Sequence, residues 1–194
     1  MKQHEKPTAV FALCGSFCTF SKALPQMEQL VQAGYELIPV MSFNAAGLDT
    51  RFGTAQQWKQ RIRQITGKLP LDTLQGVEPL GPKNMADAMI VAPCTGTTLA
   101  KLALGISDTP VTLAVKSMLR GGRPVLLAPS TNDGLGISAA HIAALMLRKN
   151  IYFVPFAQDD WLKKPQSLQS DFTLLPEALA SALNGRQMQP VLLT

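Results

Sequence analysis

The sequence predicts an α/β fold, a three-layer αβα sandwich in which helices cover both faces of a mostly parallel sheet. Short aliphatic and β-branched runs alternate with helix-like patterns, which is typical of parallel strands joined by helices. The apolar runs lack strict polar and apolar alternation, as expected of strands covered on both faces. The chain has 194 residues and no internal repeat or linker. We therefore expect a single domain over residues 1–194.

The predicted elements alternate in order along the chain. Strands are expected at 8–13, 35–41, 88–92, 124–128 and 151–154. Helices are expected at 19–33, 54–66, 98–104, 109–120, 135–149 and 175–183. Residues 67–87 and 156–173 are rich in Pro, Gly and polar residues and are predicted to be the least regular. The order indicates a Rossmann-like (flavodoxin-like) sheet, whose ligands bind outside the carboxyl ends of the strands.

Composition limits the kind of protein. Apolar residues make up 46% of the chain and charged residues 16%, so we expect copies of the chain to cover part of its surface as a homo-oligomer. There is no signal-peptide pattern and no unbroken apolar run of 18 residues, so neither secretion nor a membrane span is expected. The three cysteines cannot all pair within one chain, and reduced thiols in a cytoplasmic protein are the simplest account. No second Cys/His pair accompanies the Cys14–Cys18 spacing, so no metal site is predicted.

The net charge of +5 is concentrated in one stretch. Between residues 51 and 68 there are basic residues and no acidic one: Arg51, Lys59, Arg61, Arg63 and Lys68. The stretch is either a solvated helix face or a surface that attracts an acidic ligand or partner. No basic stripe interleaved with aromatic residues and no helix-turn-helix pattern is found, so nucleic acid is not an expected partner.

The ends of the first two predicted strands carry small and hydroxyl residues. CGSFCTFSK follows the first strand, where Gly15 permits a tight turn and Ser16 or Thr19 supplies a hydroxyl that could also cap the next helix. The amino terminus of a helix offers free N–H groups and a positive dipole to an anion. MSFNAAG follows the second strand, where Ser42 and Asn44 are either turn residues or ligands of the same anion. Neither a G-x-G-x-x-G nor a P-loop pattern is present.

The ends of the next two strands are richer in polar groups than a turn requires. PCTGTT, which begins at Pro93, places Thr95, Thr97 and Thr98 around Gly96, and only one threonine can cap the helix. APSTNDGLG contains Asn132, Asp133 and two glycines, which also exceed the needs of a turn. Four polar strand ends on one sheet predict a ligand with several polar groups, and a mononucleotide fits this better than a simple acid.

The same loops carry a family resemblance. PCTGTT followed by LAKLALGISD, and PSTN ending at Asn132, resemble motifs of the flavoprotein family that includes phosphopantothenoylcysteine decarboxylase, lantibiotic decarboxylases and flavin prenyltransferases. Within that family the chain is similar, over nearly its whole length, to the B subunits of dipicolinate synthases. The segments that carry this similarity are CGSFCTFSK, VAPCTGTTLAKLALGISDTPVTLAVKS, APSTNDGLG and KNIYFVPFAQDD.

The resemblance implies an αβα sandwich that binds FMN, often at a subunit interface of a trimer. It places Gly15, Ser16 and Ser42 near the phosphate, the segment 95–98 along the flavin, and Asn132 toward the substrate. It further implies that dipicolinate is made from a dihydro- or hydroxytetrahydrodipicolinate precursor. The partner would be an A subunit with a nicotinamide-binding fold, in the cytoplasm of the mother cell during sporulation.

The sequence departs from the family pattern at several positions. Decarboxylases of the family carry a His before the third strand, and the corresponding stretch VEPLGPKNMADAM has none. His141 lies in the apolar run GISAAHIAALML and is expected to be a packed helix residue. Thr97 replaces the Asn of the family motif, and Ser130 and Thr131 replace its x-Met pair.

Three functional hypotheses follow from these observations. In the first, the chain binds FMN and helps to oxidise a dihydrodipicolinate-type ring, with Lys22, Lys101 and Lys116 as candidate cations for the carboxylates. In the second, it is a non-catalytic partner that binds or activates the A subunit. In the third, it is a cysteine-based decarboxylase or transferase that uses Cys94, whose pKa nearby helix amino termini could lower, although such a cysteine is more often simply packed.

Overall fold

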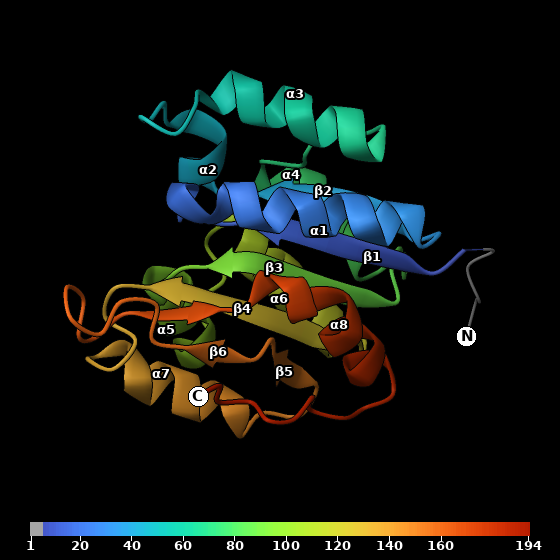
Figure 1. Cartoon of the computed structure of the whole chain (residues 1–194). Coiled ribbons are helices and arrows are strands. Elements are labelled where there is room, and N and C mark those ends of the chain that lie inside the picture. Colours follow the sequence, from blue (N-terminus) through green and yellow to red (C-terminus); the bar gives the residue numbers. More distant parts are fainter. Residues whose placement is uncertain (1–5) are drawn as a thin grey trace.

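The computed structural model describes residues 6–194 and shows a sheet covered by helices on both faces (Figure 1). Its parallel part runs in the order β2-β1-β3-β4-β5, the order of flavodoxin-like doubly wound sheets. The strands of this part are β1 (Thr8–Leu13), β2 (Glu36–Met41), β3 (Ala88–Cys94), β4 (Val125–Thr131) and β5 (Ile151–Phe153). The predicted fold class is therefore confirmed.

Two short strands extend the sheet beyond β4. β7 (Leu168–Ser170) pairs antiparallel with residues 130 and 131 of β4, and β6 (Phe156–Ala157) pairs antiparallel with β7. Both fall in the stretch 156–173, which we predicted to be irregular. Strands of two and three residues are too short to show a periodic pattern, so only their pairing to β4 reveals them.

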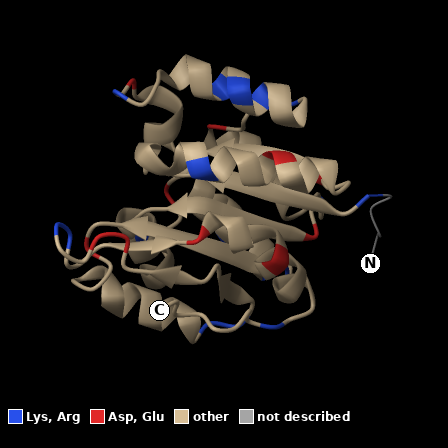
Figure 2. Ribbon diagram, viewed as in Figure 1, with Lys and Arg blue, Asp and Glu red and all other residues tan. Residues whose placement is uncertain are grey.

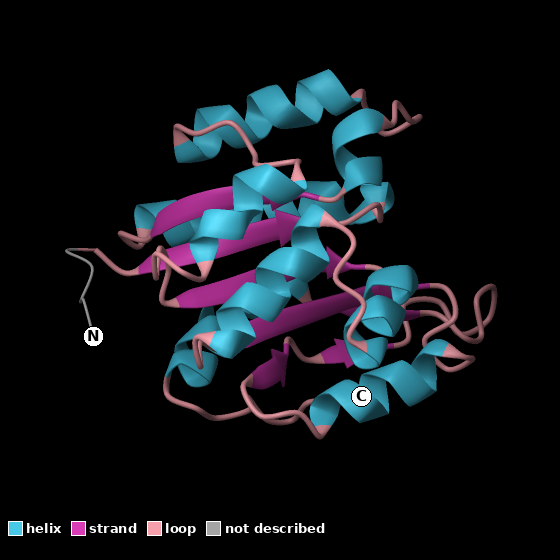
Figure 3. Ribbon diagram, turned by 180° about the vertical axis from the view of Figure 1, so that it is seen from behind, coloured by secondary structure: helices cyan, strands magenta, loops and turns pink. Residues whose placement is uncertain are grey.

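Helices from different parts of the chain form the two outer layers (Figure 3). One face of the sheet carries α1 (Phe20–Gln32), α3 (Ala55–Thr66) and α8 (Leu175–Leu183). The other face carries α4 (Leu74–Val77), α5 (Gly96–Leu104), α6 (Pro110–Arg120) and α7 (Ser138–Met146). The remaining helical turns are α2 (Phe43–Gly47) and the short 3-10 segments Phe17–Thr19, Glu78–Leu80 and Phe172–Leu174.

Two cores lie on opposite faces of the sheet, and they explain why the strands show no alternation of polarity. In β1, Val10 and Ala12 pack into the core beneath α6, whereas Phe11 and Leu13 pack into the core beneath α1. All six residues of β1 are buried. Both sides of the strand must therefore be apolar, as in other parallel sheets.

Local capping fixes the helix boundaries. Thr54 and Gln57 form a reciprocal capping box at the start of α3, and Gly67 ends that helix in the left-handed conformation. α7 is shorter than the predicted 135–149, because residues 133–137 form a turn in which Gly136 N–H donates to the Asp133 carbonyl at 2.9 Å. No helix within residues 6–194 is long and apolar enough to cross a membrane.

The basic stretch lies largely on α3 (Figure 2), and three of its five basic residues form ion pairs. Lys59 lies 2.7 Å from Asp72, Arg61 pairs with Glu28, and Lys68 lies 2.5 Å from Glu36. These pairs neutralise much of the local charge. The arrangement favours a solvated surface over an open cationic one.

Candidate functional site

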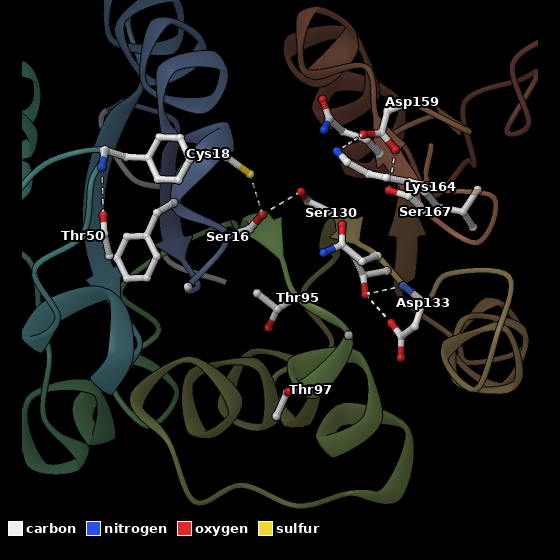
Figure 4. A pocket seen from close by; sticks show the side chains of 18 residues that line it. Ser16, Cys18, Thr50, Thr95, Thr97, Ser130, Asp133, Asp159, Lys164 and Ser167 are labelled. Atoms are coloured by element: carbon white, nitrogen blue, oxygen red, sulfur yellow. Dashed lines mark hydrogen bonds and ion pairs between the residues drawn. The ribbon is translucent and has the colours of Figure 1, made fainter. Parts of the chain in front are cut away.

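A cavity of about 500 Å³ opens at the carboxyl ends of β1, β3 and β4, where the topology predicts a ligand (Figure 4). Backbone hydrogen bonds hold these strand ends together, because Cys14 N–H donates to the Pro93 carbonyl at 3.1 Å. Most lining residues are small, hydroxyl or amide residues, and the rest are two aromatic, three charged and one aliphatic residue. They are Gly15, Ser16, Phe17, Cys18, Thr50, Phe52, Thr95, Gly96, Thr97, Ser130, Thr131, Asn132, Asp133, Asp159, Lys164, Ser167, Leu168 and Gln169.

A second cavity of about 310 Å³ shares Gly15, Thr95 and Thr97 with the first. Its other lining residues come from the end of β2 and from α5 and the start of α6: Ser42, Phe43, Asn44, Thr98, Lys101 and Thr109. Ser42 N–H donates to the Leu13 carbonyl at 3.0 Å, which brings the ends of β1 and β2 together. The two cavities adjoin at the amino terminus of α5.

At the start of α5, threonine hydroxyls cluster next to buried cysteine thiols. Thr95 caps the helix by accepting a hydrogen bond from Thr98 N–H at 3.4 Å, and the two hydroxyls lie 3.0 Å apart. Thr98 Oγ1 also donates to the Cys14 sulfur at 3.3 Å. Thr97 is exposed and lines both cavities. Of the three threonines, Thr97 is therefore the one free to meet a ligand.

Gly96 occupies a position with no room for a side chain. A Cβ atom there would lie 2.7 Å from Thr131 Oγ1 and 2.8 Å from both Asp133 Oδ1 and Ser138 Oγ. These three groups are hydrogen-bonded to one another, because Asp133 accepts from Thr131 and, at 2.9 Å, from Ser138. The bonds from Thr131 and Ser138 hold the pKa of the Asp133 carboxyl below its usual value. The turn after β4 thus packs directly on the backbone of α5.

The loop after β1 is joined to the end of β4 by side chains. Ser16 Oγ lies 2.8 Å from Ser130 Oγ, and Figure 4 shows the two hydroxyls facing each other. Thr19 instead turns its hydroxyl to the Ser16 carbonyl at 2.8 Å and is buried. Ser16 is therefore a wall of the larger cavity, whereas Thr19 holds the loop in shape.

Most of the predicted site residues line the two cavities. Gly15, Ser16, Thr95, Gly96, Thr97 and Asn132 line the larger cavity, and Ser42 and Thr98 line the smaller. Ser16 and Ser42, which the resemblance places together at a phosphate, border different cavities. Thr19 and Pro93 line neither, because both are buried beneath the loops.

Several lining residues were not foreseen from the sequence. Phe17, Thr50 and Phe52 come from the segments that precede α1 and α3, and the lining residues between Asp159 and Gln169 come from the connection between β6 and β7 and from β7 itself. The two excess glycines of APSTNDGLG were the available signal. A Cβ atom on Gly134 would lie 2.6 Å from Leu168, and one on Gly136 would lie 2.8 Å from Gln166 Oε1. Because Gly134 and Gly136 lack side chains, the segment that contains Gln166 and Leu168 can pack against them. The sequence alone does not show that this segment lies beside the turn after β4.

The candidate cations lie at different places. Lys101 lines the smaller cavity and pairs with both carboxylate oxygens of Asp108 at 2.9 Å. Lys22 hydrogen-bonds to Gln169, a residue of the larger cavity. Lys116 lies 3.4 Å from Ser107 Oγ beside a separate cavity. Lys116 is therefore not a cation of this site.

Cys94 and His141 do not supply chemistry to the cavity. Cys94 is completely buried, and its pKa is raised well above the usual value by burial and by the neighbouring Cys14. The lowered pKa expected of a nucleophile is thus wrong, because desolvation outweighs any helix dipole. His141 is a partly buried residue of α7 that does not line either cavity, which agrees with the packed role we expected.

Comparison with known proteins identifies the class. The model of the flavoprotein family matches residues 1–169, and the chain belongs to this family. More particularly, it is 44% identical over 182 residues to the dipicolinate synthase B subunit of Bacillus subtilis (strain 168), covering 94% of this chain and 91% of that protein.

Solved structures agree with this placement. The crystal structure of the dipicolinate synthase B subunit from Bacillus halodurans matches with a TM-score of 0.89 and 42% identity, covering 100% of this chain and 99% of that one. An FMN-dependent cysteine decarboxylase from thioviridamide biosynthesis matches with a TM-score of 0.55 and 27% identity, covering 74% of this chain and 86% of that one.

Proposed function

We propose that this chain is the FMN-binding B subunit of a dipicolinate synthase, with residues 1–194 forming one flavoprotein-like domain. Acting with a nicotinamide-binding A subunit, it converts dihydrodipicolinate, or its hydroxytetrahydro precursor, to dipicolinate in the cytoplasm of the mother cell during sporulation. The similarity to the Bacillus subtilis protein supports the identity of the complex. The two adjoining cavities at the amino terminus of α5 are the observation that carries the cofactor proposal.

The residues present fit FMN. The smaller cavity offers the hydroxyls of Ser42 and Thr97 beside the free N–H groups at the start of α5, a donor set suited to a phosphate. The larger cavity, of about 500 Å³, has the volume of a small-molecule site and offers both aromatic rings and polar groups to a flavin ring. Gly15, Thr95 and Thr97 border both cavities and would contact the ribityl chain between phosphate and ring.

When bound, FMN would supply an acceptor for the hydride that a dihydropyridine ring loses, with a proton, as it becomes aromatic. The chain's own residues would hold the ring and the cofactor side by side and restrict the access of water. Asn132 is exposed at the cavity edge and can donate a hydrogen bond to the substrate. No proton transfer by His141 or Cys94 is required.

Purification followed by absorbance spectroscopy tests the proposal. We expect a yellow protein, or a colourless one that takes up added FMN in equal molar amount, with a flavin spectrum that persists through gel filtration. The A subunit alone, this chain alone and their mixture would then be assayed with the precursor and a nicotinamide cofactor. A protein that ignores added FMN contradicts the cofactor role. If the A subunit alone matches the mixture, this chain has no part in the reaction.

We further propose that copies of the chain associate through α7. This helix carries no Lys, Arg, Asp or Glu (Figure 2). The apolar residues that flank it are exposed, with the Ile137 side chain 72% accessible and the Leu147 side chain 89% accessible. Leu104, at the end of the neighbouring α5, is 68% accessible. Exposed apolar side chains at the ends of these neighbouring helices are the kind of surface that a second copy of the chain could cover.

An Ile137→Asp, Leu147→Asp double variant is expected to dissociate the oligomer. Two carboxylates buried at an interface carry a desolvation penalty far above the cost of exposing two aliphatic side chains. Light scattering after gel filtration would show a mass several times 20.9 kDa for the wild type and a mass near that of one chain for the variant. A Lys149→Glu variant is the control for a change of charge alone, and its mass should equal that of the wild type. A monomeric wild type contradicts the proposal.

A further inference from the structure

We propose that Lys164 binds a carboxylate of the substrate and so makes the larger cavity specific for a flat ring that bears carboxylates. The inference rests on the proposed function and adds to it a residue outside the family motifs. Lys164 is the one cationic side chain among the described residues that line this cavity. The lysines suggested by the sequence do not line it.

The other charged groups of the cavity are already engaged. Asp133 accepts hydrogen bonds from Thr131 and Ser138. Asp159 accepts one from Ser167 and, at 3.2 Å, one from Lys164. Burial raises the pKa of the Asp159 carboxyl, but the bonds from Ser167 and Lys164 outweigh it and hold the pKa below the usual value. Both carboxylates therefore have hydrogen-bond partners of their own within the protein.

Lys164 retains capacity for a ligand. Its ammonium group has three donors and gives one to Asp159. Its side chain is 50% accessible and that of Asp159 is 20% accessible. This partly exposed pair contributes little free energy, so it leaves the other two donors of the ammonium group available. A substrate carboxylate can take the remaining donors.

The backbone around Lys164 is anchored to the cavity wall. Lys164 N–H donates to the Asp160 carbonyl at 2.7 Å, and Ser167 N–H donates to the Lys164 carbonyl at 3.0 Å. Leu135 N–H, in the turn after β4, donates to the Gln166 carbonyl at 2.9 Å. These bonds tie the loop that carries Lys164 to the turn after β4, which also packs on Gly96. The wall of the cavity therefore fixes the backbone position of Lys164.

Two aromatic side chains contribute to the recognition site. Phe17 and Phe52 line the cavity, and Figure 4 shows Thr50 and Lys164 on opposite sides of Ser16 and Ser130. Phe17 packs on Phe20 with ring centroids 5.4 Å apart, and Phe20 packs edge-on against Trp58 at 5.1 Å. The Phe17 ring, held in this way, can stack on a planar heterocycle, while Lys164 binds its charged substituent.

Calorimetric titration of the full chain, with saturating FMN, tests the role of Lys164. The probes are dipicolinate, which carries two carboxylates, and pyridine, which carries none. Lys164→Gln is expected to weaken dipicolinate binding by about 10- to 100-fold, the loss typical of a hydrogen bond to a charged group, and to leave pyridine binding unchanged. Lys164→Arg should restore most of the affinity. The control is Lys163→Gln, because Lys163 is exposed on the same loop and does not line the cavity.

The outcomes separate this inference from the proposed function. A wild type that binds no FMN contradicts the proposed function, and titration of the same FMN-free chain with dipicolinate still tests Lys164. A wild type that binds FMN but no dipicolinate overturns the role of Lys164. So does a Lys164→Gln variant with the affinity of the wild type, or a Lys163→Gln variant with an equal loss. An equal fall in FMN affinity would show a general distortion of the site and also overturn the inference.

Discussion

Gly96→Ala is expected to weaken FMN binding at least tenfold and to lower the free energy of unfolding by about 1–3 kcal/mol, the range for overpacked sites. The added methyl group would lie 2.7–2.8 Å from Thr131, Asp133 and Ser138. These side chains share hydrogen bonds through Asp133 Oδ1 and cannot move apart one at a time. The higher helix propensity of Ala would stabilise the protein by only about 1 kcal/mol. The steric clash therefore outweighs it, and the variant is expected to have a lower free energy of unfolding.

Gly47→Ala is the matched control for this variant. Gly47 ends α2, has open space around its Cα atom, and lines neither cavity. Denaturant unfolding and fluorescence titration with FMN would be measured for both variants. A Gly96→Ala protein with the stability and FMN affinity of the wild type would show that the turn after β4 can move away from α5 at no cost.

Raising the pH from 9 to 11 is expected to destabilise the protein through Cys14. Burial raises the pKa of its thiol from 9.0 to about 11, although hydrogen bonds from Thr98 and Thr95 oppose the shift. The unfolded chain therefore loses this proton first. The contribution to stability is complete below pH 9 and is lost as the pH approaches 11, with a total on the order of 2–3 kcal/mol.

Unfolding in denaturant at pH 8, 9, 10 and 10.5, with a reductant present, measures this effect. Cys14→Ala should be less stable at pH 8, because it loses packing, but its stability should fall less steeply with pH. Residues that titrate on the surface affect both proteins alike, so the difference between the two slopes reports the Cys14 thiol together with its effect on the neighbouring Cys94. Cys18→Ala is the control, since Cys18 is exposed, and it should follow the wild type. Equal slopes for wild type and Cys14→Ala would contradict the prediction.

The sheet was predictable because its signals are local. The run 8–13 coincides with β1, and the predicted strand at 151–154 differs from β5 by one residue. Aliphatic runs predict the strands, and capping residues such as Thr54 and Thr109 predict the helix starts, from residues that are adjacent in the chain. The start of α5 was placed two residues late, because Thr95 rather than Thr97 is the cap. Boundary errors of this size are expected where several threonines compete for one role.

The composition of the site was predictable only in part. Strand ends of a parallel sheet converge at one edge, so Gly15, Ser42, Thr97 and Asn132 could be assigned to one region from their order alone. The roles of Thr19 and Ser16 could not be separated, because both are small hydroxyl residues in one loop. Their difference lies in which way each hydroxyl points, toward the Ser16 carbonyl or toward Ser130.

Patterns of neighbouring residues were enough to establish the layered α/β fold, the membership of the flavoprotein family and the four polar strand ends, because each of these is carried by residues adjacent in the chain. The three-dimensional arrangement was needed to show that Phe52 and Lys164 line the same cavity as Ser16. It was also needed to show that Cys94 is completely buried and that the Asp133 side chain packs where a side chain on Gly96 would lie. These are contacts between segments far apart in the chain, and no local pattern of residue types specifies them.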